Sequence, residues 1–238
     1  MTSIDPGEIA KFSALAAQWW DQDGPFAALH RMNPARLAFV IEAATDLRAG
    51  PKRLSGVRAL DVGCGGGLVS LPLARLGADV LGIDAAEEAI GAARARAAAA
   101  GVGARFRCAT VEDLAAEGAQ FDLVTALDVI EHVQDPQAFV AACANLVRPG
   151  GRLVVSTINR TAKARALALF AAERVLRWAP EGAHDYDKLV TPEEIRRAAP
   201  DIDWGAPVGL SYEIGGRGWR RSGDASMNYM MAGARREP

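Results

Sequence analysis

The sequence predicts an α/β protein built on a doubly wound, mostly parallel sheet. Between residues 57 and 157, short apolar runs alternate with helical segments, which is typical of a parallel sheet with crossover helices. The run at 121–127 is mostly apolar, as expected for a strand that is buried on both faces. A cluster of glycines at 63–67 follows the first apolar run and precedes a helix.

The core elements are expected to follow one another in a regular order. The five strands are predicted at 57–62, 79–83, 104–108, 121–127 and 153–157. The three helices between them are predicted at 68–76, 87–100 and 136–147, the last stopped by Pro149-Gly150-Gly151. In such a sheet, ligands bind beyond the carboxyl ends of the strands.

The segments outside this core are predicted to form a cap, an insertion and a C-terminal extension of a single domain, 1–238. The cap, 1–50, contains helices at 8–20 and 34–47, and the core of alternating strands and helices, which carries the ligand-binding edge of the sheet, spans 57–157. The insertion, 160–190, is predicted to be a lid or a membrane-facing helix. A further helix starts with Thr191 as N-cap and Pro192 at the first position. Two more strands are expected near 207–214 and 227–232.

Charge and cysteine content limit the classes of protein that fit. The 238 residues include 27 basic and 29 acidic side chains, for a formal net charge of -2, so no broad basic surface for nucleic acid is expected. The three cysteines, Cys64, Cys108 and Cys143, form no C-x-x-C pair, which favours a reducing compartment. No apolar run approaches the length of a membrane span, and the N-terminus is unlike a targeting peptide. We therefore expect a bacterial cytoplasmic protein.

The most specific local pattern is the loop between the first strand and its helix. Gly63, Gly65 and Gly67 follow Asp61, and Asp84 ends the next strand 21 residues after Gly63. Glycines let a ligand approach the backbone, and an acid at that distance can accept the hydroxyls of a ribose. The dinucleotide fingerprint requires glycine or alanine where Leu68 stands, so the variant favours S-adenosylmethionine. The alternative is a tight turn that binds nothing.

Several segments then carry a resemblance to a known family. Residues 57–157 resemble a class I S-adenosylmethionine-dependent methyltransferase, whose Rossmann-like sheet has seven strands. The segments 19–37, 60–67 (LDVGCGGG), 127–133 (LDVIEHV), 147–160 and 182–194 together resemble the ubiquinone biosynthesis O-methyltransferases. The first and last of these segments are more diagnostic than the glycine loop, which the whole superfamily shares. The resemblance covers about residues 10–195 and 208–229.

The resemblance implies where the cofactor binds. Arg36 matches the arginine that meets the methionine carboxylate, and a guanidinium suits that group. Gly63 and Gly65 match the loop that lines S-adenosylmethionine, Asp84 matches the ribose ligand, and Leu127 matches a position that lines the cofactor. Glu112 and Asp113 lie where the superfamily often contacts adenine, and the sequence does not choose between them.

The resemblance also implies roles for Asp128, Glu131 and His132, a D-x-x-E-H cluster after the fourth strand. Relatives have E-x-x-E-H there as a proposed Mg²⁺ site, and Mg²⁺ favours carboxylate oxygens and lowers the pKa of a bound phenol. Histidine is an unusual Mg²⁺ ligand, so His132 could instead be the general base. A third interpretation is that Glu131 and His132 only cap the helix that starts at Asp135-Pro136.

The acceptors implied by the resemblance are phenolic hydroxyls of polyprenylated ring intermediates, at the 2-polyprenyl-6-hydroxyphenol and 3-demethylubiquinol steps. Such lipids imply peripheral contact with an anionic inner membrane and with other ubiquinone-biosynthesis proteins. The composition of residues 160–179 supports the membrane contact. This segment contains five basic side chains, only one acid, Glu173, and several apolar residues. A lid over the site explains the same segment equally well.

Other interpretations stay open at this point. Five residues of the cap either wall an aromatic acceptor or pack the cap: Trp19, Trp20, Phe26, His30 and Met32. His184 is a further candidate near the acceptor. The chain could methylate another small molecule, or it could be a non-catalytic protein that retains the fold. Leu68 argues against a nicotinamide dehydrogenase.

Overall fold

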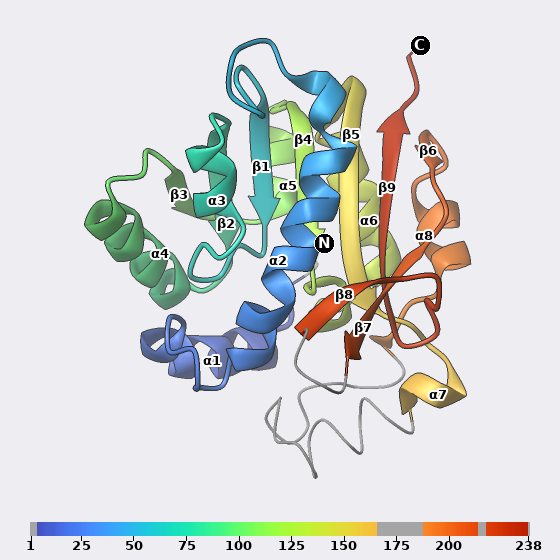
Figure 1. Cartoon of the computed structure of the whole chain (residues 1–238), viewed down its shortest axis with the longest axis horizontal. Helices are drawn as coiled ribbons and strands as arrows, with labels where there is room; N and C mark the ends of the chain where they lie inside the picture. Colours follow the sequence, from blue (N-terminus) through green and yellow to red (C-terminus); the bar gives the residue numbers. More distant parts are fainter. Residues whose placement is uncertain (1–3, 166–187, 214–217, 238) are drawn as a thin grey trace.

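The structure, a computed structural model, describes residues 4–165, 188–213 and 218–237. The strands in these residues are β1 (Arg58–Val62), β2 (Asp79–Asp84), β3 (Arg105–Cys108), β4 (Phe121–Leu127), β5 (Val147–Ile158), β6 (Ile202–Trp204), β7 (Val208–Glu213), β8 (Gly218–Ser222) and β9 (Asn228–Arg235). They form one mixed sheet in the order β3-β2-β1-β4-β5-β9-β7-β8, with β6 beside β9 (Figure 1). Strands β1 to β5 pair in parallel, and the later strands pair antiparallel.

Helices cover both faces of this sheet. They are α1 (Pro6–Leu15), α2 (Ala27–Ala43), α3 (Ser70–Arg75), α4 (Glu87–Ala100), α5 (Val111–Ala116), α6 (Pro136–Asn145), α7 (Ala162–Ala164) and α8 (Pro192–Ala198), with 3₁₀ turns η1 (Ala16–Gln18), η2 (Thr45–Leu47) and η3 (Ile130–His132). Helices α2 and α3 pack on one face, and α4 extends this layer beside β3. Helices α5, α6 and α8 pack on the other face. The result is a three-layer domain (Figure 1).

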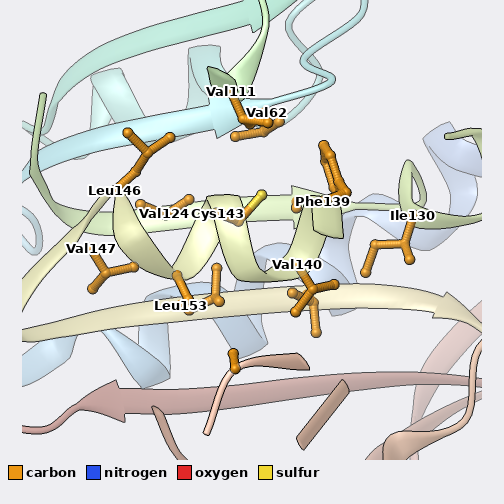
Figure 2. Close-up of a cluster of buried hydrophobic side chains, with 14 of the residues drawn as sticks. Val62, Val111, Val124, Ile130, Phe139, Val140, Cys143, Leu146, Val147 and Leu153 are labelled. Carbon is orange, nitrogen blue, oxygen red and sulfur yellow. The ribbon is translucent and has the colours of Figure 1, made fainter. Parts of the chain in front are cut away.

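The two halves of the core follow from the alternation of side chains along the central strands. On β4, Leu123 belongs to the cluster under α2 and α3, whereas Val124 belongs to the cluster under α5 and α6. Figure 2 shows Phe139, Val140 and Cys143 of α6, which belong to one buried cluster with Val124 of β4 and Leu153 of β5. Full burial of a valine or phenylalanine side chain of this kind stabilises the fold by about 1.5–3 kcal/mol. This packing holds the parallel strands in register and aligns their carboxyl ends.

The predicted fold class is confirmed, and several details differ. The sheet has nine strands in the described residues rather than seven, because β6 and β8 add to the two C-terminal strands that were expected. Helix α5 was not expected at all, and it is only six residues long. The motif Pro149-Gly150-Gly151 lies inside β5, beside an irregularity in its pairing with β4, instead of following the helix directly.

The second cap helix also differs from its prediction. It starts at Ala27 and not at Pro34, so that Pro34 lies inside the helix. Pro34 is exposed, which keeps its ring away from the core. Of the predicted insertion at 160–190, residues 166–187 lie outside the described residues, and so do His184 and most of the basic segment. Among the helices of the described part, none is long and apolar enough to cross a membrane.

Candidate active site

A cavity lies at the carboxyl edge of β1, β2 and β4, beneath α1. Its floor includes Val62, Gly63, Ile83, Asp84, Leu127 and Asp128, which end these strands or follow them directly. Its roof includes Glu8, Ile9 and Phe12 of α1. Strand β1 lies between β2 and β4, so the chain reverses its direction of winding here, where doubly wound sheets bind ligands.

The glycine loop is shaped by close neighbours on both sides. Gly63 has φ 64°, and a Cβ there would lie 2.6 Å from a methyl carbon of Val129. Gly65 has φ 50°, and a Cβ there would lie 1.9 Å from Cζ2 of Trp19. Only glycine fits both positions, because each requires a left-handed backbone and leaves no room for a side chain.

The indole of Trp19 therefore rests directly on the loop. Its ring stacks on Phe26 with a centroid distance of 4.0 Å, and the side chain is buried. Its N–H is also buried and has no hydrogen-bond partner in the described part of the chain. An acceptor on a ligand beside the loop would satisfy this donor.

Asp84 is held at the end of β2 by the backbone. One carboxylate oxygen accepts the N–H of Gly65 at 2.9 Å, and the other accepts the N–H of Ala86 at 2.9 Å. Burial raises the pKa of Asp84, against the lowering effect of these hydrogen bonds. A carboxylate oxygen has two lone pairs, so each oxygen can accept a further hydrogen bond from a ligand hydroxyl. This geometry fits the ribose role that was expected for Asp84.

Asp61 supports the loop from behind. Its carboxylate accepts hydrogen bonds from the hydroxyls of Ser70 at 2.5 Å and Thr125 at 2.8 Å, and burial raises its pKa. It also lines a second, smaller cavity together with Arg36. Trp19, Leu29, Gly63 and Leu127 line both cavities, so the two spaces lie side by side along the glycine loop.

Arg36 projects from α2 into the smaller cavity. Its side chain is 3% exposed, and its guanidinium pairs with the carboxylate of Asp128. One further N–H donates to the side-chain oxygen of Asn33 at 3.2 Å. The Nε–H is buried and has no hydrogen-bond partner among residues 4–165, 188–213 and 218–237. A buried guanidinium with an unused donor fits the carboxylate end of S-adenosylmethionine.

The D-x-x-E-H cluster does not gather around one point. Asp128 pairs with Arg36 and accepts the hydroxyl of Ser156 at 2.9 Å. Glu131 is 4% exposed and accepts the hydroxyl of Thr157 at 2.8 Å.

His132, the third member, turns to α1, where its Nδ1–H donates to a carboxylate oxygen of Glu8 at 2.8 Å. Within the residues that the structure describes, no group of three His, Cys, Asp or Glu side chains is placed to hold a metal ion. The side chains of the cluster therefore do not fit the Mg²⁺ site that was expected, and we derive no step through it.

The charges around His132 also shift its titration and that of its partner. Burial lowers the pKa of His132, but the hydrogen bond to Glu8 and the nearby acids together raise it above its ordinary value. The same hydrogen bond lowers the pKa of Glu8 to about 2. Burial raises the pKa of Glu131. Glu8 and His132 thus form an ion pair in mildly acidic solution.

Replacement of Glu8 by glutamine should reveal this pair in a pH-dependent way. The contribution of Glu8 is present above its unfolded pKa of 4.5 and is lost as the pH falls toward 2. The contribution of His132 is present below its unfolded pKa of 6.5 and is lost as the pH rises through its raised folded value. At pH 6 we expect Glu8→Gln to lower the free energy of unfolding by about 1–2 kcal/mol, and at pH 9 by much less.

Urea denaturation at the two pH values measures this difference. Glu88→Gln is the matched control, since Glu88 accepts the hydroxyl of Ser13 on α1 at 2.6 Å and has no histidine partner in this contact. Its effect should be the same at both pH values. An equal loss of stability at pH 6 and pH 9 for Glu8→Gln would contradict the ion pair.

The structure separates the remaining candidates. Glu112 and Asp113 do not line the cavity, whereas the adjacent Thr110 and Val111 do. Asp113 instead forms a capping box with Thr110 at the start of α5. Leu127 lines both cavities, so its assignment to the cofactor site stays a prediction that this position allows.

Most of the aromatic residues of the cap pack against other residues of the cap and the glycine loop. This agrees with the second interpretation, in which they pack and do not wall the acceptor. Phe26 is buried beside Leu68, and His30 Nε2 lies 2.8 Å from the carbonyl oxygen of Trp19. The indole of Trp20 donates to the carbonyl of Gly66 at 3.0 Å. Trp19 is the member of this group that lines the cavities.

Helix α1 contributes residues to the site that the sequence analysis did not predict. Its Glu8, Ile9 and Phe12 face the cavity, and the ring of Phe12 meets the edge of His132 with a centroid distance of 5.1 Å. Besides the Glu8 contact, Asp5 at its N-cap pairs with Lys188 at 2.6 Å. None of these contacts has a sequence signal, because each joins residues that are far apart in the chain.

Comparison with known proteins defines the class. The methyltransferase domain family matches residues 60–155. Magnesium protoporphyrin IX methyltransferase from Synechocystis PCC 6803, solved with bound S-adenosylhomocysteine, has a TM-score of 0.66 at 19% identity, over 95% of this chain and 94% of that chain. A methyltransferase from Thermotoga maritima has a TM-score of 0.63 at 16% identity, over 95% of this chain and 99% of that chain. The fold is that of the class I S-adenosylmethionine-dependent methyltransferases.

Full-length relatives define the family more narrowly. The ubiquinone biosynthesis O-methyltransferase of Sinorhizobium fredii is 48% identical over 98% of this chain and 97% of that protein. The corresponding enzyme of Caulobacter sp. strain K31 is 49% identical over 96% of this chain and 94% of that protein. The chain belongs to the ubiquinone biosynthesis O-methyltransferase family, and it is an S-adenosylmethionine-dependent O-methyltransferase.

Proposed function

We propose that the protein methylates phenolic hydroxyls of polyprenylated phenols and catechols, at the 2-polyprenyl-6-hydroxyphenol and 3-demethylubiquinol steps of ubiquinone biosynthesis. The names of its full-length relatives support this acceptor class. The observation that supports it in the structure is the cavity itself. It places a half-buried acid, Asp84, and a histidine, His132, beneath a roof that includes the apolar side chains of Ile9 and Phe12.

In this proposal the chain binds S-adenosylmethionine along the glycine loop. Asp84 accepts the ribose hydroxyls, the backbone at Gly63 and Gly65 lines the nucleoside, and Leu127 packs beside it. The unused N–H of Arg36 meets the carboxylate. When bound, S-adenosylmethionine would supply a methyl group on a positively charged sulfur, and the neutral thioether would be the leaving group when an oxygen nucleophile attacks the methyl carbon. The chain contributes mainly alignment, because an in-line displacement needs no covalent intermediate.

The remaining chemical task is to remove the phenol proton. We assign this general-base role to His132, whose ring lines the cavity and is oriented by the hydrogen bond from Nδ1 to Glu8. With Nδ1 as the donor to Glu8, Nε2 is the nitrogen that takes the proton in this assignment. Glu131 is buried against Thr157 and supports the loop that holds the histidine.

The acceptor is a lipid, so peripheral contact with an anionic inner membrane, and with other proteins of the same pathway, belongs to this proposal. The basic character of residues 160–179 in the sequence supports the membrane contact. The alternative is the transfer of methyl groups to a different small molecule. One assay can address both points if the acceptor is offered in detergent and in vesicles of anionic phospholipid.

The test is methyl transfer from labelled S-adenosylmethionine to a short-chain prenylated catechol. The matched control is the same prenylated ring with both hydroxyls already methylated, which should accept no label. We expect turnover with the catechol that is the same in excess EDTA and in added Mg²⁺, because the D-x-x-E-H side chains have separate partners.

Other outcomes would change the proposal. Turnover that is lost in EDTA and restored by Mg²⁺ would return Asp128, Glu131 and His132 to a metal site and remove the base role of His132. Binding of S-adenosylmethionine without turnover on any prenylated phenol would show that the acceptor class is wrong.

A further inference from the structure

The ion pair between Arg36 and Asp128 lies at the boundary between the two cavities. Arg36 lines the smaller cavity, and Asp128 lines the larger one. A ligand that reaches from Asp84 in the larger cavity to Arg36 in the smaller one must pass this pair. The charges at this boundary therefore face the middle or the end of such a ligand.

Asp128 is fixed in place by more than its charge. Its φ is 54°, the only positive φ of a residue other than glycine in the described part of the chain. Its backbone N–H donates to the carbonyl of Ser156 at 3.0 Å, and its side chain accepts the hydroxyl of the same residue at 2.9 Å. A strained backbone that is held from both sides is typical of a functional position. It keeps this carboxylate aimed at the boundary.

The electrostatics of the pair argue against a metal role for Asp128. The guanidinium of Arg36 is buried and needs a counter-ion, and Asp128 supplies it. A divalent cation at the same carboxylate would lie next to this positive charge and would be repelled. The pair matches a ligand end that itself holds one positive and one negative group.

The amino-acid end of S-adenosylmethionine has this character, because an α-ammonium and an α-carboxylate are attached to the same carbon. We infer that Arg36 and Asp128 together recognise this zwitterion, with Asp128 as the acceptor for the ammonium. The inference rests on the proposed function, since it assumes that S-adenosylmethionine binds along the glycine loop. In this inference Asp128 is a cofactor-binding residue and not a ligand of Mg²⁺.

Two ligands and two variants test this role. S-adenosylhomocysteine has the amino-acid end, whereas 5′-methylthioadenosine lacks it and keeps the ribose and adenine. By calorimetry we expect Asp128→Asn to weaken the binding of S-adenosylhomocysteine about 10- to 30-fold and that of methylthioadenosine less than about twofold. Asp84→Asn is the matched control, and it should weaken both ligands to the same degree.

A second measurement uses the unaltered protein, so the inference can be tested even if the Asp128→Asn variant does not fold. The analogue of S-adenosylhomocysteine without its α-amino group should bind at least about tenfold more weakly than the parent. Equal binding of these two ligands, or equal weakening of both nucleosides by Asp128→Asn, would overturn the inference. If the unaltered protein bound neither S-adenosylhomocysteine nor methylthioadenosine, the proposed function itself would fail.

Discussion

Gly65→Ala is expected to lower the free energy of unfolding by about 3 kcal/mol and to weaken the binding of S-adenosylhomocysteine more than about tenfold. Two costs add at this position. A residue with a Cβ is strained at φ 50°, and the new methyl group would lie 1.9 Å from the ring of Trp19. The ring is buried against Phe26, so it cannot move aside without disrupting the cap.

Gly101→Ala separates these two costs. Gly101 ends α4 with φ 62°, but a Cβ there meets no atom within 4 Å. This variant should lose only about 1 kcal/mol, from backbone strain, and should keep its affinity for the ligand. Urea denaturation and calorimetry of both variants provide the comparison. Equal losses of stability for the two variants would show that the contact with Trp19 has no energetic weight.

Arg36→Lys is expected to weaken the binding of S-adenosylhomocysteine about 30- to 100-fold, with little effect on methylthioadenosine. Lysine keeps a positive charge opposite Asp128, so the partly buried carboxylate retains a counter-ion. It lacks the planar fork and the Nε–H, the donor that is unused in the smaller cavity. The loss should therefore fall on the ligand with a carboxylate and not on the fold.

Arg31→Lys is the matched control, because Arg31 lies on the same helix and its side chain is 50% exposed. This substitution should change neither ligand affinity nor stability. Arg36→Met should behave differently from Arg36→Lys, since it leaves Asp128 without its partner and should lower the free energy of unfolding by about 3 kcal/mol. If Arg36→Lys bound both ligands normally, Arg36 would have no part in recognising the carboxylate.

The parallel half of the sheet could be predicted because its signals are local. The apolar runs at β1, β2 and β4 were found within one or two residues of their observed bounds. Helix α5 was missed because six residues are too few for a helical period, although its capping residues, Thr110 and Asp113, stand at the right spacing in the sequence. The start of α2 was misplaced because Pro34 was interpreted as the first residue of a helix, and here the helix tolerates it on an exposed face.

The site could be predicted only in part, for a similar reason. The positions of Gly63 and Asp84 follow from topology, since Gly63 directly follows β1 and Asp84 ends the neighbouring parallel strand β2. Arg36 could be assigned only through family resemblance, because nothing near it in the sequence marks it as buried. The partners of Asp128 and His132 come from helices that lie 92 and 124 residues away along the chain. The family resemblance implied a shared metal, whereas in the structure each of the three side chains has a different partner.

The roof of the site also determines how the cofactor enters. No residue of α1 is buried, and the helix is attached to the core through polar pairs of Glu8, Ser13 and the N-cap Asp5 and through Phe12 and Leu15, which pack beside Trp19 and Phe26. Polar pairs at a surface hold far less free energy than the packed layers beneath them. We therefore expect α1 to detach more readily than the sheet unfolds, so that its amide protons should exchange with solvent faster than those of β1 and β4. Exchange of the spent cofactor then becomes sensitive to ionic strength, because dissolved salt screens the same pairs.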